Sequence, residues 1–216
     1  KLTGSIPTGI TNLTQLTEIY LGENQLSGPL PNNIGNLTEL VTLTLSDNQL
    51  SGNLPESLGN CNKLKILHLY NNQFTGEIPA SLGNLSLIKN LDFSHNQFTS
   101  LPDEMGNWNN VEELNLNNNQ LTSFPASINN LANLTTLYAK HNQIAELPEN
   151  FGAFPILFDI NLSYNNLKEF PEELCLLSEL QSISFMNNKI EKFPASITML
   201  PPALNYLALD SNEIKG

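Results

Sequence analysis

The stretch Leu16-Thr17-Glu18-Ile19-Tyr20-Leu21-Gly22-Glu23-Asn24-Gln25-Leu26 decides the fold of this chain, because its pattern returns eight more times. By residue type the pattern is L-x-x-L-x-L-x-x-N-x-L, with other apolar residues at some of the leucine positions. Its asparagine is present in every copy: Asn24, Asn48, Asn72, Asn96, Asn119, Asn142, Asn165, Asn188 and Asn212. A fixed period of 23 or 24 residues predicts a solenoid in which each repeat packs on its neighbours.

The alternation of leucine with other residues predicts a short strand in each repeat, with the leucines facing inward. One such strand cannot bury its apolar side alone, so the strands should stack into a parallel sheet. The asparagine follows the strand, where the chain turns away from the sheet. Since its amide both donates and accepts, we expect the nine asparagines to form a buried structural ladder that satisfies backbone groups at the bends.

The repeats account for the whole chain, which we interpret as a single domain spanning residues 1–216. A partial repeat (1–15) precedes eight full repeats (16–203), and a second partial repeat (204–216) follows them. Neither end carries a recognisable cap, although the ends of a solenoid need polar cover. We expect either that the chain is a fragment of a longer array or that something covers its ends, as end-to-end self-association through the uncapped termini would.

The repeat pattern resembles that of the leucine-rich-repeat family over essentially the whole chain. Residues 2–7, 26–31, 50–55 and 74–79 match the L-x-G-x-[IL]-P signature of plant-type repeats, except that Phe74 replaces the first leucine. From Ile88 onward the glycine is absent and most repeats are one residue shorter. The resemblance implies a right-handed α/β horseshoe with a concave parallel sheet and a convex side of 3₁₀ and extended segments. The glycine-containing turns favour a second strand in the first repeats, which should disappear after about Ile88.

Composition excludes several classes of partner. The formal net charge is −12 and arginine is absent, so the chain has no basic stripe for nucleic acid or anionic lipid. A cationic or neutral polar partner is the natural complement. No stretch is long and apolar enough to insert into a membrane.

The two cysteines, Cys61 and Cys175, lie five repeats apart. This separation of about 24 Å is too large for a disulfide, so buried thiols are expected.

The outward positions of the strands carry all five tyrosines and all three histidines. Tyrosine offers a large contact area with a polar tip, which suits recognition of a protein or peptide ligand. We therefore predict a partner-binding concave face, and a role as the recognition module of a larger receptor, adhesin or secreted effector. The predicted contact residues are Tyr20, Ile66, His68, Tyr70, Asp92, His95, Asn115, Tyr138, Lys140, His141, Asn161, Tyr164, Met186 and Tyr206.

Catalysis is not expected. His68 and Asp92 occupy the same position of adjacent repeats and could form a cross-strand hydrogen bond, and Ser94 follows two residues later. An open sheet offers neither an oxyanion hole nor a water-excluding pocket, which this triad chemistry requires. The three histidines have no metal-ligand spacing, and no cofactor motif is present. We predict no enzyme activity, no metal and no cofactor.

Two other functions stay open. The array could be a structural spacer without a specific ligand. A run of glutamines (Gln25, Gln49, Gln73, Gln97, Gln120 and Gln143) could instead form a flat polar surface for carbohydrate or ice.

Sites of possible N-glycosylation are Asn12, Asn36, Asn84, Asn133 and Asn161, each in an N-x-S/T motif. They favour an extracellular or cell-surface location. The alternative is a cytoplasmic scaffold.

Overall fold

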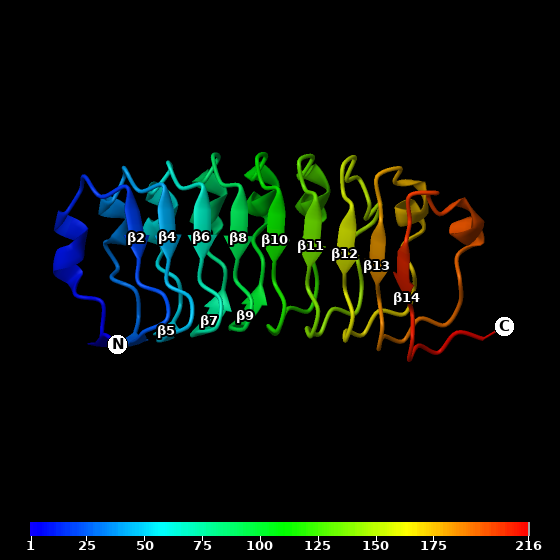
Figure 1. The fold of residues 1–216 in the computed structure, drawn as a ribbon, viewed down its shortest axis with the longest axis horizontal. Coiled ribbons are helices and arrows are strands. Elements are labelled where there is room, and N and C mark those ends of the chain that lie inside the picture. Colours follow the sequence, from blue (N-terminus) through cyan, green and yellow to red (C-terminus); the bar gives the residue numbers. More distant parts are fainter. Residues whose placement is uncertain (216) are drawn as a thin grey trace.

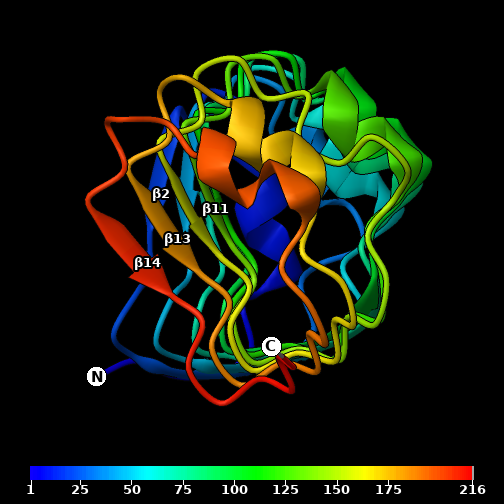
Figure 2. The same cartoon turned by 90° about the vertical axis from the view of Figure 1, so that its right-hand side faces the viewer.

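The computed structural model describes residues 1–215 of the chain. The repeats stack side by side, so that the two ends of the chain lie at opposite ends of an elongated solenoid (Figure 1). Seen along the stack, the strands line one side, and the 3₁₀ helices lie across the interior from them (Figure 2). The predicted solenoid with a parallel sheet is confirmed.

The main sheet contains nine parallel strands in the order of the repeats. They are β2 (Glu18–Tyr20), β4 (Thr42–Thr44), β6 (Ile66–His68), β8 (Asn90–Asp92), β10 (Glu113–Asn115), β11 (Thr136–Tyr138), β12 (Asp159–Asn161), β13 (Ser182–Ser184) and β14 (Tyr206–Ala208). Adjacent strands pair in register, so Leu114 of β10 lies between Leu91 of β8 and Leu137 of β11. The middle residue of the main-sheet strands from β2 to β13 points into the core, and its two neighbours point outward to what we call the concave face.

A second sheet of five strands runs beside the first part of the main sheet. It consists of β1 (Thr3–Gly4), β3 (Gln25–Gly28), β5 (Gln49–Gly52), β7 (Gln73–Glu77) and β9 (Gln97–Ser100). The glycines Gly4, Gly28, Gly52 and Gly76 have positive φ, which explains the glycine of the plant-type signature.

The second sheet extends one repeat further than predicted, because β9 lies beyond Ile88 in a repeat without that glycine. β9 can form because β7, the last strand with a glycine, offers it an extended edge. The pairing is irregular, with a register shift between Gly76 and Glu77. Beyond β9 only an isolated bridge between Ser123 and Glu146 continues the pairing among the described residues.

The convex side carries one 3₁₀ helix in most repeats. The helices are η1 (Thr8–Asn12), η2 (Ile34–Asn36), η3 (Glu56–Asn60), η4 (Ala80–Asn84), η5 (Asp103–Asn107), η6 (Ala126–Asn130), η7 (Glu172–Leu176) and η8 (Ala195–Met199). Most follow a proline in an extended conformation, such as Pro55 before η3. The sixth repeat has turns at residues 149–152 in place of a helix.

The core is a continuous column of leucine and phenylalanine side chains between the main sheet and the 3₁₀ helices. Larger rings replace leucine in the fourth repeat, where Phe98 packs against both Phe74 and Phe93. Trp108 is fully buried, and its indole N–H donates to the carbonyl of Leu82 at 2.8 Å. The described part of the chain contains no helix with the length and apolar character needed to cross a bilayer.

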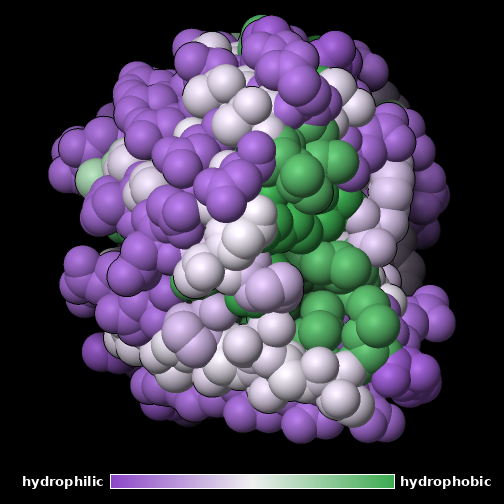
Figure 3. All heavy atoms as spheres, turned by 90° about the vertical axis from the view of Figure 1, so that its left-hand side faces the viewer, coloured by the Kyte–Doolittle hydropathy of each residue, from purple (hydrophilic) through white to green (hydrophobic). Residues whose placement is uncertain are grey.

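The N-terminal end of the stack leaves apolar atoms uncovered (Figure 3). Leu2 and Leu13 are 56% and 57% exposed there. Exposed apolar side chains are also present in the last repeats, among them Met199 and Leu207.

Candidate binding surface

The main sheet sets the spacing of the candidate contact residues. Because the strands pair without a shift, equivalent outward residues of neighbouring repeats are direct cross-strand partners, as His68 and Asp92 are. None of the five tyrosine rings is buried: Tyr20, Tyr164 and Tyr206 are exposed, and Tyr70 and Tyr138 are half-buried. Tyr20 and Tyr206 lie on the two outermost strands, so the structure does not bring them together with the central residues.

The residue before each ladder asparagine has a left-handed backbone, which the repeat pattern alone did not reveal. The φ angle at this position is 52° at His95, 56° at His141 and 57° at Tyr164. Non-glycine residues seldom adopt this conformation. It turns the chain sharply at the end of the strand region and holds these three side chains at the rim of the concave face.

Hydrogen bonds join the central part of the face across three strands. His68 Nε2 lies 3.0 Å from Asn90 Oδ1, so this nitrogen carries the proton and donates. Asn90 in turn donates to Glu113 at 2.6 Å. The hydrogen bond considered between His68 and Asp92 is therefore not formed, although the two residues are cross-strand partners. The imidazole reaches diagonally to Asn90, at the other end of the same neighbouring strand.

Asp92 is instead engaged by three other groups. Its Oδ1 accepts from the backbone N–H and the hydroxyl of Ser94, at 2.9 and 2.6 Å. Its Oδ2 accepts from Asn115 at 3.0 Å. Ser94 is buried and hydrogen-bonded to the carboxylate rather than to the histidine. This geometry does not form a nucleophile–histidine–carboxylate relay.

A cluster of cationic and aromatic groups lies beside this network, on the sixth and seventh repeats. The rings of His141 and Tyr164 stack with centroids 4.2 Å apart, and the Lys140 ammonium is 5.0 Å from the centre of the Tyr164 ring. Burial, and then the charges of Lys140 and His95, lower the pKa of His141. At neutral pH the cluster therefore presents one cation and two neutral rings, an arrangement that favours contacts through aromatic faces.

Tyr138 and Asp159 form the second polar pair of this region. The phenol donates a hydrogen bond to the Asp159 carboxylate. Burial, followed by the hydrogen bond and charge of Asp159, raises the pKa of Tyr138 to about 12. The phenol thus stays protonated and fixed in orientation.

The other predicted contact residues lie around these groups. Ile66, Tyr70, Asn161 and Met186 are half-buried on the face, and the Tyr70 ring is tilted against His68 with centroids 6.3 Å apart. His95 accepts from Asn118 at 3.2 Å. Sequence reasoning missed Asn90, Glu113 and Asp159, although they share one outward column, because residue type alone does not say which neighbours will bond.

The nine asparagines each connect two repeats. Asn119, for example, accepts from the backbone N–H of Phe98 at 3.0 Å and donates to the carbonyl of Phe93 at 3.0 Å, both in the preceding repeat. The equivalent Oδ1 acceptors link Asn24 to Leu2 at one end and Asn212 to Ile190 at the other. The side chains from Asn96 to Asn188 are buried, so the ladder satisfies backbone groups that water does not reach.

The N-x-S/T motifs lie mainly on the side away from the main sheet. Asn12, Asn36 and Asn84 are the exposed last residues of η1, η2 and η4, and Asn133 is exposed in a loop. Asn161 lies on β12, where its Oδ1 accepts from the Ser163 backbone N–H at 3.0 Å.

Both cysteines are free and buried, as expected. Burial raises the pKa of the Cys61 thiol to about 11, and the thiol lies 3.5 Å from the carbonyl of Ile34. Burial also raises the pKa of Cys175. Both thiols are therefore protonated at neutral pH and poorly nucleophilic. Among the described residues no group of three His, Cys, Asp or Glu side chains could hold a metal ion.

Several solved structures are similar to this chain. One is the Arabidopsis receptor kinase HAESA in complex with the peptide hormone IDA and the co-receptor SERK1, with 31% identity and a TM-score of 0.92 over 99% of this chain. A TDR receptor shares 26% identity with a TM-score of 0.91 over 98% of the chain. A plant ice-binding protein shares 27% identity with a TM-score of 0.81 over 100% of the chain.

The chain spans 36% of the HAESA chain and 37% of the TDR chain, but 70% of the ice-binding protein. A sequence search of curated proteins found no match. Family models described as leucine rich repeat match residues 15–37, 39–61, 63–85 and 86–144. The chain therefore belongs to the leucine-rich-repeat family, with plant-type repeats in its first part.

Proposed function

We propose that the chain is an extracellular recognition module that binds a peptide or protein ligand on its concave face. The observation that carries this proposal is the Lys140–His141–Tyr164 cluster beside the hydrogen-bonded network around Asp92. Ordered polar groups next to accessible rings are the composition that protein interfaces favour. Similarity to a receptor crystallised with a peptide hormone supports the same function.

The charge of the face suggests the character of the ligand. The nine described strands carry Glu18, Asp92, Glu113 and Asp159 at outward positions and no lysine, and Lys140 follows β11. We infer a ligand with cationic and aromatic or apolar groups, because an acidic face attracts positive charge. We also propose that the chain is part of a larger receptor, adhesin or secreted effector. In this proposal the chain has no catalytic activity of its own.

Alanine substitution of Tyr70 or Tyr164 is expected to weaken ligand binding about tenfold or more. Tyr70 packs against His68 of the hydrogen-bonded network, and Tyr164 belongs to the cluster beside it. Peptides selected from a random library on the immobilised protein would serve as probes, with affinities measured by calorimetry. Phe193→Ala is the control, since this ring is 49% exposed and lies away from the main sheet. Unchanged affinity in both tyrosine variants would place the binding site elsewhere.

Ice binding is the second candidate, favoured by the similarity to a plant ice-binding protein. Gln25, Gln49, Gln73 and Gln97 begin successive strands of the second sheet and are exposed. They would supply a regular polar surface outside the concave face. Thermal hysteresis in solution, retained by the tyrosine variants, would favour this function over peptide recognition.

We also propose that the 216-residue polypeptide associates end to end through the apolar surface seen at its N-terminal end (Figure 3). The paired substitution Leu2→Gln and Leu13→Gln is expected to lower the apparent mass at high protein concentration, because both side chains are mostly exposed there. Sedimentation velocity over a range of concentrations measures this. A wild-type protein that stays monomeric throughout would contradict the proposal.

A further inference from the structure

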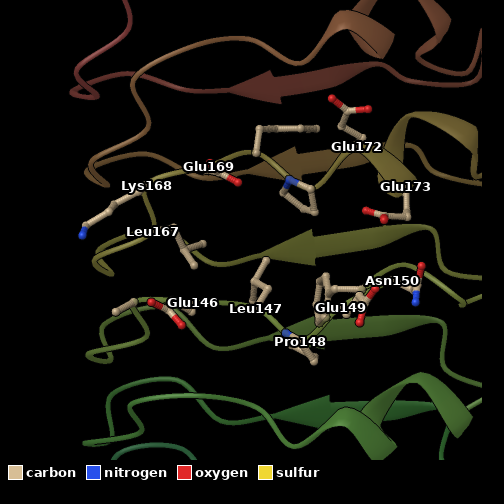
Figure 4. Close-up of a pocket in the computed structure, with 14 residues that line it drawn as sticks. Glu146, Leu147, Pro148, Glu149, Asn150, Leu167, Lys168, Glu169, Glu172 and Glu173 are labelled. Carbon is tan, nitrogen blue, oxygen red and sulfur yellow. The ribbon is translucent and has the colours of Figure 1, made fainter.

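A groove of about 650 Å³ opens on the flank of the sixth and seventh repeats, away from the concave face (Figure 4). Residues 145–151 form one wall, and residues 167–173 form the other. The groove lies beyond the end of the second sheet, in the part of the stack where the flanks of the repeats are no longer joined as strands.

The two walls of this groove are not paired with each other as strands. In the third repeat the equivalent segment is β7, which pairs with both β5 and β9. Among the residues that the structure describes, no backbone hydrogen bond joins residues 146–149 to residues 168–171. A turn with positive φ at Asn150 and Gly152 replaces the 3₁₀ helix beside the groove.

Some backbone groups of the two walls are already bonded, since the carbonyl of Lys168 accepts from Glu191 and that of Glu149 accepts from Asn129. The backbones of Leu147 and Glu169 make no hydrogen bond within the described chain, so a third segment can bond them.

The side chains divide the groove into an apolar floor and an acidic rim. Leu147 is half-buried at the floor, where Leu167 and Phe170 are almost fully buried. The rim carries five glutamates: Glu146, Glu149, Glu169, Glu172 and Glu173. None of these is in a salt bridge within the described chain, where the two ion pairs lie elsewhere.

The one lysine of the lining does not neutralise the rim. In Figure 4 the Lys168 side chain extends away from the groove, while the glutamates border it on several sides. Five carboxylates that border one groove and form no ion pair repel one another. Positive groups placed between them would relieve that repulsion.

We propose that this groove docks an extended segment of a partner polypeptide in which lysine or arginine alternates with apolar residues. The apolar side chains would cover Leu147 and its neighbours, and the cationic side chains would lie along the glutamate rim. The backbones of Leu147 and Glu169 would add hydrogen bonds to the main chain of the segment. The groove is separate from the concave face, so this proposal is independent of the ligand proposed for that face.

A labelled peptide of about eight alternating lysine and leucine residues is the probe, with fluorescence anisotropy as the measurement. The triple variant Glu146→Gln, Glu149→Gln, Glu169→Gln is expected to weaken its binding about tenfold, and added salt should weaken binding to the wild type. The substituted residues are exposed, so circular dichroism should show an unchanged fold.

The matched control removes the same charge from exposed glutamates elsewhere that form no ion pair, as Glu18→Gln, Glu77→Gln, Glu179→Gln. It should change the affinity less than twofold, and Tyr164→Ala should leave it unchanged. Equal weakening by the two triple variants would overturn the proposal, because the peptide would then sense only net charge. Failure of the wild type to bind the peptide, or equal binding of a glutamate–leucine peptide, would also overturn it, without bearing on the concave face.

Discussion

Replacing Asn119 with alanine is expected to lower the free energy of unfolding by about 3 kcal/mol. Its amide accepts from Phe98 and donates to the carbonyls of Phe93, Leu116 and Asn117, and only 8% of the residue is exposed. Alanine leaves these backbone groups buried without a partner, and each unsatisfied group costs about 1 kcal/mol or more. Urea denaturation followed by circular dichroism measures the change.

Alanine variants of two other asparagines serve as comparisons for Asn119→Ala. Asn107 is exposed at the end of η5, so Asn107→Ala should change stability by less than about 0.5 kcal/mol. Asn24 begins the ladder where water reaches it, so Asn24→Ala should cost about 1 kcal/mol. If the Asn119 and Asn107 variants were equally stable, the hydrogen bonds of the ladder would contribute nothing to the free energy of unfolding.

Adding a single methyl group at Gly59 is expected to destabilise the protein by about 2–3 kcal/mol. A Cβ built on Gly59 would lie 2.1 Å from the carbonyl oxygen of Ser81 and 2.5 Å from its carbonyl carbon. Both are backbone atoms of the next repeat, so the two turns of the convex side must move apart to admit the methyl group. Thermal unfolding of Gly59→Ala, compared with the wild type, measures the loss.

Gly9→Ala is the matched control, because Gly9 also lies in a 3₁₀ helix of the convex side. A Cβ there would meet no atom within 4 Å, and no positive φ opposes alanine. Alanine also has less conformational freedom than glycine in the unfolded chain, so this variant should be as stable as the wild type or up to about 1 kcal/mol more stable. A comparable loss in both variants would point to helix propensity rather than the close approach of neighbouring repeats.

The backbone of the stack was predictable from the sequence, since the leucine positions fix which residue of every strand faces inward. Once Leu91, Leu114 and Leu137 are aligned in the core, their outward neighbours are aligned as well. The extent of the second sheet was less predictable, because β9 depends on the edge that β7 provides and not on its own sequence.

The pairing of surface side chains could not be deduced in the same way. His68 has Asp92 directly opposite, yet it bonds the diagonal neighbour Asn90, while Ser94 and Asn115 take up the carboxylate. Such choices depend on side-chain rotamers and competing partners, which a repeat pattern does not encode. The acidic groove was missed for another reason: it arises where backbone pairing stops, and no residue motif marks that point.

The left-handed residue at the end of each strand region has a consequence for how new specificities arise. Its φ stays between 52° and 57° whether the residue is Glu23, Tyr164 or Ser211. The packing of neighbouring repeats, and not the type of side chain, thus sets the backbone conformation at this residue and the direction in which its side chain projects. Substitutions at this position can therefore change the side chain that a ligand meets at the rim without changing the backbone direction from which it projects. These positions are suitable for evolutionary diversification and for randomised libraries.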